Sequence, residues 1–322
     1  MCRQFLTLLL LLFSIVTAHA ADNYALLVGV TKSRAPSRVL LADCSRDEQA
    51  SEHDDGQHGA FTVESAATDP PRGLRAGAVA EQMQVVTNSI DMKLVLIPAG
   101  EFLMGSPEGE KDREANEGPQ HRVRISKPFY LGETEVTQEQ FRAVMNTEPW
   151  KGKTFMQENG RNAASYISHD DATEFCRRLS QREGKTYRLP REAEWEYACR
   201  GGTTTRFHFG DDESRLGEYA WFDGNARDKD EKYAHAVRQK KPNPFGLYDM
   251  HGNVWEWCED WHDGECYASS PDTDPTGPVS GSFRVFRGGA WSDGQYLVRC
   301  ARRIGFPPGY RGLNVGFRLV LE

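Results

Sequence analysis

Apolar residues that recur at helical spacing predict three helices along the chain. The first begins at a capping-box sequence, Thr-Gln-Glu-Gln at residues 137–140, and apolar residues follow at the next turns. The second opens with Ser-His-Asp-Asp at 168–171 and stops at Gly184. The third starts just after Pro190 and ends at the glycine pair 201–202. The second helix places one apolar face towards the core, formed by Ala172, Phe175, Cys176 and Leu179.

Two other patterns predict strands. Residues 92–105 combine a β-branched run with a Pro-Ala-Gly turn at 98–100, which predicts a β-hairpin. Polar and apolar residues alternate at 121–125, as in a half-buried strand. Beyond Cys199 the chain consists mostly of turn residues, short apolar runs and tryptophans. Such a region needs side-chain hydrogen bonds, disulfides or metal ions to hold it, because it offers few long backbone ladders.

The N-terminus has the pattern of a secretory signal peptide. Arg3 gives a positive start, residues 5–16 are apolar, and Ala18-His19-Ala20 forms a small-x-small cleavage site. Residues 1–20 are therefore predicted to be removed, which places the mature protein outside the cytoplasm, secreted or periplasmic, without a stable membrane span. The alternative is an uncleaved anchor, although the apolar block is short for a bilayer.

The segment that follows, residues 21–87, is predicted to be a mostly disordered leader. It contains an apolar run at 23–30 that resembles the opening strand of caspase-like peptidase domains, but the rest of such a domain does not follow. Residues 31–83 are rich in Ser, Asp, Ala, Arg and Gly and show no sustained period of either kind. The leader is consistent with the remnant of a lost domain, and the folded domain is expected over 88–322.

Composition and charge narrow the classes of function. The chain has 322 residues, of which 39% are hydrophobic, enough for a large core. Its net charge is −8, with basic and acidic residues interspersed, so nucleic acid is not an expected partner. In an oxidising compartment cysteines tend to form disulfides, but spacing alone does not give their pairing. Those beyond the signal peptide are Cys44, Cys176, Cys199, Cys258, Cys266 and Cys300.

A series of short motifs runs through the chain from about Asn88 to Glu322. They are Ile-Pro-Ala-Gly-Glu-Phe at 97–102, Glu-Val-Thr at 135–137, Arg-Leu-Pro at 188–190, Glu-Ala-Glu-Trp-Glu-Tyr-Ala at 192–198, Gly-Leu-Tyr-Asp at 246–249, Gly-Asn-Val-Trp-Glu-Trp at 252–257, Arg-Gly-Gly at 287–289 and Gly-Phe-Arg at 316–318. In this order they resemble the formylglycine-generating enzyme family, also called sulfatase-modifying factors. The resemblance implies an irregular α+β domain on a C-type-lectin-like core, with little regular secondary structure.

The resemblance also implies a chemistry. Enzymes of this family oxidise a Cys of an exported sulfatase to formylglycine, using oxygen and a copper ion held by two thiolates, the soft ligands that suit Cu(I). In this chain the first of those two cysteines falls on Asp293. The second falls within 295–298, which contains no cysteine. The copper site is therefore expected to be absent.

The remaining cysteines have other expected roles. By the resemblance, Cys199 and Cys300 form a disulfide, which closes a long loop and contributes about 4 to 5 kcal/mol in the loop-entropy model. Cys176 matches a family cysteine whose partner is missing here, so it is expected to be a buried free thiol. Cys258 and Cys266 have no family counterpart, and their spacing permits a small disulfide loop, free thiols, or a relocated metal or catalytic pair.

A calcium ion is the cofactor that the resemblance implies. Its ligands in the family map onto Asp249, Gly252, Val254 and Glu256. The two acidic residues would donate carboxylate oxygens and the other two backbone carbonyls, the hard oxygen donors that calcium prefers. Alternatively, Asp249 caps a turn and Glu256 pairs with an arginine.

Two functions of different class are consistent with these features. In the first, the chain is a binding or otherwise non-standard family member that recognises an exported protein or peptide, for example a sulfatase, without the copper chemistry. In the second, it is an active oxidase that uses Cys258 and Cys266 as substitutes for the missing pair. Iron-dependent relatives need a His cluster and a further helical domain, which this sequence does not show. The arginines that border the family's substrate groove could meet an acidic partner; they are Arg299, Arg302, Arg303 and Arg311.

Overall fold

The computed structural model describes residues 84–322. The predicted signal peptide (1–20), the apolar run at 23–30 and Cys44 lie outside the described residues, as does nearly all of the predicted leader. The first strand, β1 (Val85–Thr87), lies just before the predicted start of the domain. Within the described range, no helix combines the length and the apolar character that crossing a membrane requires.

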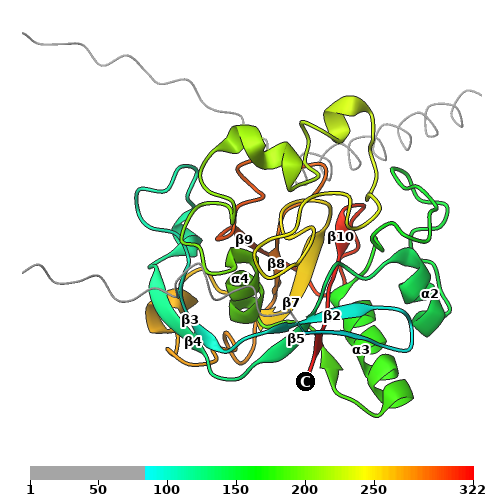
Figure 1. The fold of residues 1–322 in the computed structure, drawn as a ribbon, viewed down its shortest axis with the longest axis horizontal. Coiled ribbons are helices and arrows are strands. Elements are labelled where there is room, and N and C mark those ends of the chain that lie inside the picture. The colour runs from blue at the N-terminus through cyan, green and yellow to red at the C-terminus, as the bar shows by residue number, and fades with distance from the viewer. Residues whose placement is uncertain (1–83) are drawn as a thin grey trace, which may run out of the picture. The chain divides into compact units, whose positions relative to one another are not determined.

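A five-stranded antiparallel sheet joins the two ends of the described chain. Its order is β1-β2-β5-β11-β6, so the C-terminal strand β11 lies between β5 and β6. Val320 pairs with Leu131 on one side and with Arg188 on the other. The last strand is therefore paired within the sheet that the first strands begin (Figure 1). The strands are β2 (Lys93–Ile97), β5 (Phe129–Gly132), β6 (Tyr187–Arg188) and β11 (Val320–Leu321).

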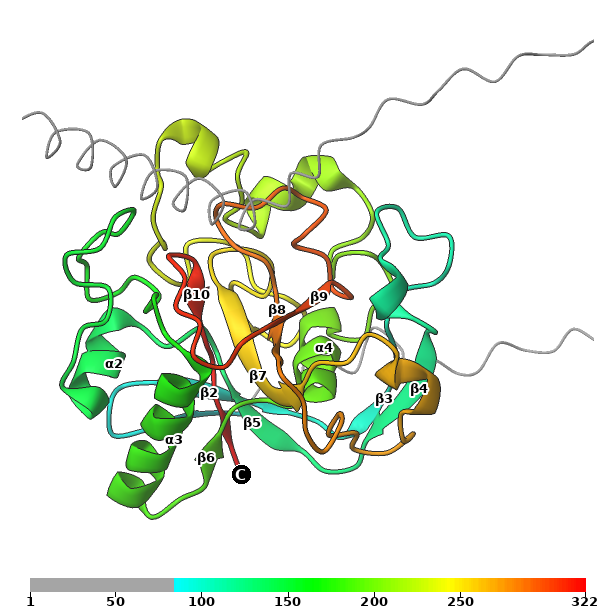
Figure 2. The same cartoon turned by 180° about the vertical axis from the view of Figure 1, so that it is seen from behind.

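A four-stranded sheet, β10-β7-β8-β9, forms the other main layer. Its strand β7 pairs antiparallel with β8 and parallel with β10. Both views place helix α4 beside β7 and β8 (Figure 1, Figure 2). The strands are β7 (Trp255–Trp261), β8 (Arg284–Arg287), β9 (Arg303–Phe306) and β10 (Val315–Gly316). Short 3-10 helices connect the turns: η1 (Ala115–Glu117), η2 (Glu213–Glu218), η3 (Arg227–Lys229) and η4 (Cys266–Ser269).

The three predicted helices are confirmed as α2 (Gln138–Met145), α3 (His169–Glu183) and α4 (Glu192–Arg200). At the first, the hydroxyl of Thr137 accepts from the Gln140 amide, and the Gln140 side chain accepts from the Thr137 amide. These reciprocal bonds satisfy amides that the helix itself leaves unpaired. All three helices end at a residue in the left-handed conformation: Asn146, Gly184 and Gly201.

The hairpin predicted over 92–105 is wrong. β2 pairs with β1 and β5, whereas β3 (Gly100–Met104) pairs with β4 (His121–Ile125) in a separate two-stranded ribbon. The Pro-Ala-Gly turn therefore passes the chain from one sheet to another instead of reversing it. Gly100 lies tightly against α4, since a Cβ there would come within 2.4 Å of the Tyr197 hydroxyl oxygen.

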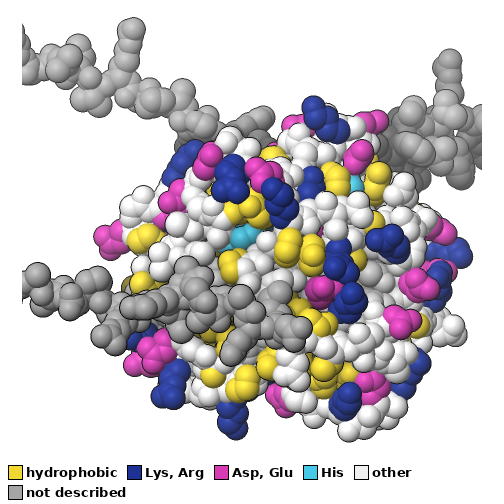
Figure 3. Space-filling view, in the orientation of Figure 1, with side chains coloured by type: hydrophobic (Ala, Val, Ile, Leu, Met, Phe, Trp, Pro, Cys, Tyr) yellow, Lys and Arg dark blue, Asp and Glu magenta, His cyan; other side chains and the backbone are white. Residues whose placement is uncertain are grey.

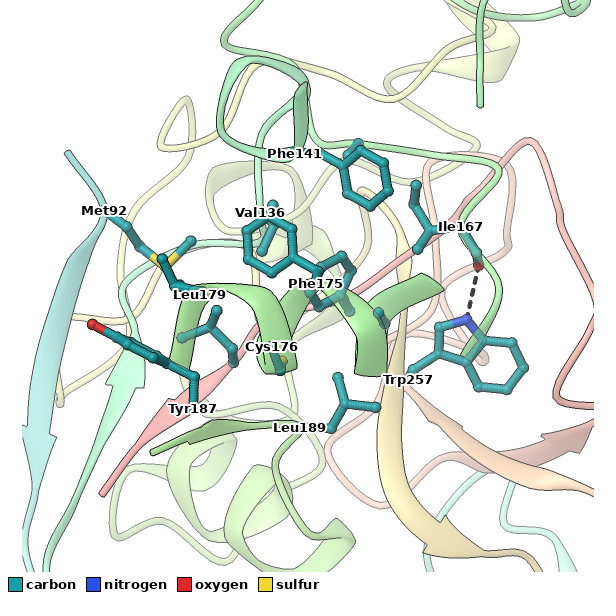
Figure 4. Packing of buried hydrophobic residues seen from close by; sticks show 14 of the residues in the cluster. Met92, Val136, Phe141, Ile167, Phe175, Cys176, Leu179, Tyr187, Leu189 and Trp257 are labelled. Atoms are coloured by element: carbon teal, nitrogen blue, oxygen red, sulfur yellow. Dashed lines mark hydrogen bonds between the residues drawn. The ribbon is translucent and has the colours of Figure 1, made fainter. Parts of the chain in front are cut away.

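The larger hydrophobic core lies between α2, α3 and the two sheets (Figure 4). Phe175 of α3 stacks on Phe141 of α2 and meets Phe317 edge to face. Trp257 of β7 is fully buried, and its indole N–H donates to the Ile167 carbonyl at 2.9 Å. Cys176 is buried in the same core as a thiol. The apolar face predicted for the second helix therefore packs as expected, and the chain has an α+β fold with few and short helices.

Charge is spread over the surface. On the coloured part of the face in Figure 3, positive and negative side chains are interspersed among apolar and uncharged ones. This agrees with the interspersed charges along the sequence.

Candidate functional site

The loop that follows β8 is the segment in which the family's copper cysteines would lie. It begins at Gly288 and Gly289, which both have positive φ angles. A Cβ on Gly289 would come within 2.5 Å of the Val298 side chain and 2.9 Å of the Leu297 carbonyl oxygen. Glycine is therefore required for the loop to fold back closely on itself.

Hydrogen bonds and a buried ion pair hold this loop in place. The Trp291 amide donates to the Asn253 carbonyl, and the Asp223 amide donates to the Asp293 carbonyl, both at 2.9 Å. At the far end of the loop the Arg299 side chain is fully buried. It donates to the carboxylates of Glu117 and Glu110, with contacts of 2.5 to 2.9 Å. The loop is thus positioned by its neighbours on several sides.

The arginines predicted to border a partner groove are mostly engaged within the protein. Arg299 and Arg303 are both buried, and Arg303 pairs with Glu192 through two nitrogens at 2.7 and 2.8 Å. Arg302 is largely enclosed, whereas Arg311 is partly exposed and pairs with Asp171. Of the four, the structure leaves Arg311 the most accessible to a partner.

Asp293 has an enclosed carboxyl group. Burial raises its pKa to about 7, hydrogen bonds from Trp255 and Ser292 act in the opposite direction, and the charge of Asp223 raises it further. Its Oδ2 atom has no hydrogen-bond partner among the described residues. Asp293 also raises the pKa of Tyr310, which burial and Tyr166 bring to about 12. The group can hold a proton near neutral pH.

These residues do not fit a copper ion held by two thiolates. The loop from 288 to 299 contains neither Cys nor Met, and the side chains around Asp293 offer hydroxyl, amide, phenol and carboxylate groups. Such oxygen donors suit hard cations, whereas Cu(I) selects thiolates. No step through copper is therefore derived for this position.

Cys258 and Cys266 do not have the features of a reactive pair. Cys258 lies in β7, fully buried, and burial raises the pKa of its thiol well above the usual value. Cys266 is half-buried at the start of η4, where its sulfur accepts from Arg303 at 3.6 Å. Burial raises its pKa as well. A raised thiol pKa opposes formation of the thiolate, the form that attacks substrates and binds metals.

Cys199 and Cys300 are brought together as predicted, but as thiols. Their sulfur atoms are 3.8 Å apart, and both side chains are fully buried. His251 lies beside them. Burial raises the pKa of Cys300, but hydrogen bonds with Cys199 and His251 outweigh it and hold that pKa well below the usual value. The predicted disulfide stays a prediction. The sequence reasoning missed His251, which stands directly before the Gly-Asn-Val-Trp motif.

The residues predicted to bind calcium lie at the start of β7 in a buried cluster of carboxylates. Glu256 is fully engaged, because Arg318 donates to both of its oxygens at 2.6 and 2.7 Å and Trp195 donates to one at 2.8 Å. Asp249 accepts the Arg238 amide on Oδ2, while its Oδ1 has no partner in the described part of the chain. The arginine pairing that was the alternative for Glu256 is thus present.

Glu135, which the sequence reasoning did not assign to this cluster, belongs to it. Its Oε1 accepts from Asn253, and its Oε2 finds no partner within residues 84–322. Burial and the charge of Asp249 raise the pKa of Glu135 well above the usual value, and burial raises that of Asp249 to about 6. Two buried carboxylate oxygens without partners fit a hard cation such as calcium. The signal for Glu135 was its place in the Glu-Val-Thr motif.

A surface cavity of about 710 Å³ borders the loop. Glu110, Lys111, Arg206 and Glu213 are among its lining residues, so it presents both signs of charge. Gln295 of the loop donates to Glu213 at 2.6 Å, which links the loop to the wall of this cavity. The cavity and the loop can therefore contact one bound molecule together.

Comparison with known proteins gives consistent matches. Residues 80–322 match the family model described as "Sulfatase-modifying factor enzyme 1-like domain". The formylglycine-generating enzyme of Streptomyces coelicolor is 31% identical over 281 residues, which cover 70% of this chain and 87% of that protein. The serine/threonine-protein kinase pkn1 of Chlamydia pneumoniae is 33% identical, but the match spans only 39% of its length.

Solved structures match the same part of the chain. PvdO from Pseudomonas aeruginosa superposes with a TM-score of 0.67 at 30% identity, covering 74% of this chain and 98% of PvdO. Variable protein 1 of Treponema denticola gives a TM-score of 0.64 at 29% identity, covering 74% of this chain and 99% of the other.

Proposed function

Because the chain belongs to the sulfatase-modifying factor family, we propose that it is an exported, non-standard member that binds a protein or peptide without oxidising it. The observation that carries this proposal is Asp293. A carboxyl group with a raised pKa occupies the place of the first copper cysteine, and the rest of the loop supplies no sulfur. A binding function needs a rigid scaffold and a presented surface, and neither depends on the lost metal.

The cavity beside the loop supports this proposal. Its walls carry Glu110, Lys111 and Arg206 together with the acidic residues 211–213. Such a mixed lining suits a peptide with charged side chains, for example the Cys-x-Pro-x-Arg segment of a sulfatase, whose arginine would meet the carboxylates. Complementary charges of this kind contribute mainly to specificity and to the rate of association.

The protein is expected to bind a Cys-x-Pro-x-Arg peptide without converting its cysteine to formylglycine. Without two thiolates at the loop, Cu(I) has no suitable ligands there. The measurement is mass spectrometry of the peptide after incubation with protein, Cu(I) and oxygen, beside titration calorimetry of the same peptide without copper. An active formylglycine-generating enzyme is the control for the assay.

Conversion of the cysteine would contradict the proposal and favour the oxidase alternative. In that case Cys258→Ser and Cys266→Ser would show whether those two thiols carry the reaction. Absence of both conversion and binding would exclude this peptide as the ligand and turn the search to other proteins or glycans.

Calcium is proposed as a structural cofactor of the carboxylate cluster. The two oxygens without partners, on Asp249 and Glu135, support it. With Glu256 engaged by Arg318, the Asp249 and Glu135 carboxylates are better placed to bind the ion than the Glu256 carboxylate that the family pattern assigns. Gly252 and Val254 would supply backbone carbonyls, as the family pattern implies.

Calcium is expected to raise the melting temperature. A ligand at 100 times its dissociation constant adds about 2.7 kcal/mol, which corresponds to roughly 5 to 10 °C for a domain of this size. Glu135→Gln removes one buried negative charge, so with EDTA at pH 8 this variant should melt higher than the wild type. With calcium it should gain less than the wild type does. Equal calcium shifts in both proteins, measured by calorimetry, would contradict a role for Glu135.

A further inference from the structure

Three side chains with metal-binding atoms meet in the interior, away from the loop position discussed above. Cys199 comes from the end of α4, His251 from the segment before β7, and Cys300 from the end of the loop after β8. All three are fully buried. Their ligand atoms lie within 4.8 Å of one another. Three separate parts of the fold thus place two sulfurs and one imidazole nitrogen around one point.

The spacing of the sulfur atoms fits a shared metal ion. A disulfide holds its sulfurs about 2.05 Å apart, whereas those of Cys199 and Cys300 are 3.8 Å apart. Zinc binds thiolates at about 2.3 Å in tetrahedral geometry, which puts two sulfurs about 3.8 Å from each other. The observed separation is therefore the one that a single tetrahedral ion between the two sulfurs requires.

His251 is oriented as metal-binding histidines commonly are. Its Nδ1 lies 2.7 Å from the Val298 carbonyl oxygen, so Nδ1 carries the proton and Nε2 keeps its lone pair. Nε2 receives only the His208 amide at 3.3 Å, beyond the usual range for such a bond. A bond from a ring nitrogen to a backbone carbonyl fixes the tautomer and leaves the other nitrogen available to a metal.

Charge and coordination number favour Zn²⁺ over Cu(I). Two thiolates and a neutral imidazole carry two negative charges, which a divalent ion neutralises and a monovalent ion does not. Neutrality matters here because a net charge in a fully buried site is costly. The neighbouring guanidinium group of Arg200 is already paired with Glu196. The Met250 carbonyl oxygen, 3.7 Å from the Cys199 sulfur, can complete a tetrahedral set.

We propose that Cys199, His251 and Cys300 bind one Zn²⁺ ion, which ties α4 and the segment before β7 to the end of the loop after β8. The site is structural, because its ligands are closed off from solvent. It excludes the disulfide that the family resemblance implies for the same two cysteines. It is also independent of the proposed binding function, since its readout is metal content and not peptide binding.

The first test is the metal and thiol content of the full chain. Protein produced with zinc in the medium should contain one zinc per chain by plasma mass spectrometry, and alkylation without reductant should label Cys199 and Cys300 after unfolding in a chelator. X-ray absorption at the zinc edge should show two sulfur and two lighter ligands. These measurements use the wild-type protein and so do not depend on a variant folding.

Variants give the matched control. Cys300→Ser and His251→Gln should lose bound zinc, whereas Cys176→Ser, which removes a buried thiol in the other core, should retain one zinc per chain. A Cys199–Cys300 disulfide in the peptide map, a chain without metal, or copper bound in place of zinc would each overturn the proposal. Retention of zinc by Cys300→Ser would overturn it as well.

Discussion

Arg318→Met is expected to lower the free energy of unfolding by about 3 to 5 kcal/mol, the usual cost of removing one partner from a buried ion pair. Arg318 is fully buried. It donates to both oxygens of Glu256 and to the carbonyls of Gly132 and Tyr248. The substitution would leave Glu256 buried without its cation. It would also remove the positive charge that lowers the pKa of the neighbouring acidic groups.

A matched exposed pair serves as the control. Arg142 and Glu148 form a 2.9 Å pair in which the arginine side chain is about half exposed. Arg142→Met should therefore cost less than about 1 kcal/mol. Urea denaturation at pH 7 measures both variants. A second substitution, Glu256→Gln in the Arg318→Met background, should recover part of the loss because it removes the unpaired charge. Similar small losses for Arg318→Met and Arg142→Met would contradict the account.

The helices could be predicted from the sequence because their signals are local. The reciprocal bonds of Thr137 and Gln140, and the left-handed stop at Gly184, each depend on residues within one turn. The strands are different, since many are two to five residues long and pair over large sequence distances. For β3 the partner β4 lies about twenty residues away, and no local pattern distinguishes it from the nearer β2.

The candidate site was predictable where a motif names the residue, and not where packing decides the role. Asp293 could be assigned by counting from the Gly-Gly pair. The engagement of Glu256 by Arg318, 62 residues away, could not be placed by spacing alone. The same holds for His251, whose place beside Cys199 and Cys300 depends on three segments meeting in the interior. Contacts between distant segments are outside the reach of periodicity.

Asp260→Asn is expected to remove much of the loss of stability that the protein shows as the pH rises. Asp260 of β7 is buried, and its Oδ2 accepts the Glu192 amide at 2.8 Å. Burial, followed by the charge of Glu192, raises its pKa to about 8. The folded protein therefore keeps this proton up to about pH 8, whereas the unfolded chain releases it near pH 4. Stability from this group is present below pH 4 and is lost as the pH rises to 8.

Each unit of such a shift corresponds to about 1.4 kcal/mol, so at pH 8.5 the Asn variant should exceed the wild type by on the order of 3 to 5 kcal/mol. Near pH 4 the two should be nearly equal, because the amide oxygen of Asn can still accept the Glu192 amide. Urea denaturation between pH 4 and 9 gives the difference. Asp212, whose pKa is lowered by hydrogen bonds from Ser214, is the control. Asp212→Asn should leave the fall with rising pH in place, and a constant difference between wild type and Asp260→Asn would show that Asp260 does not cause it.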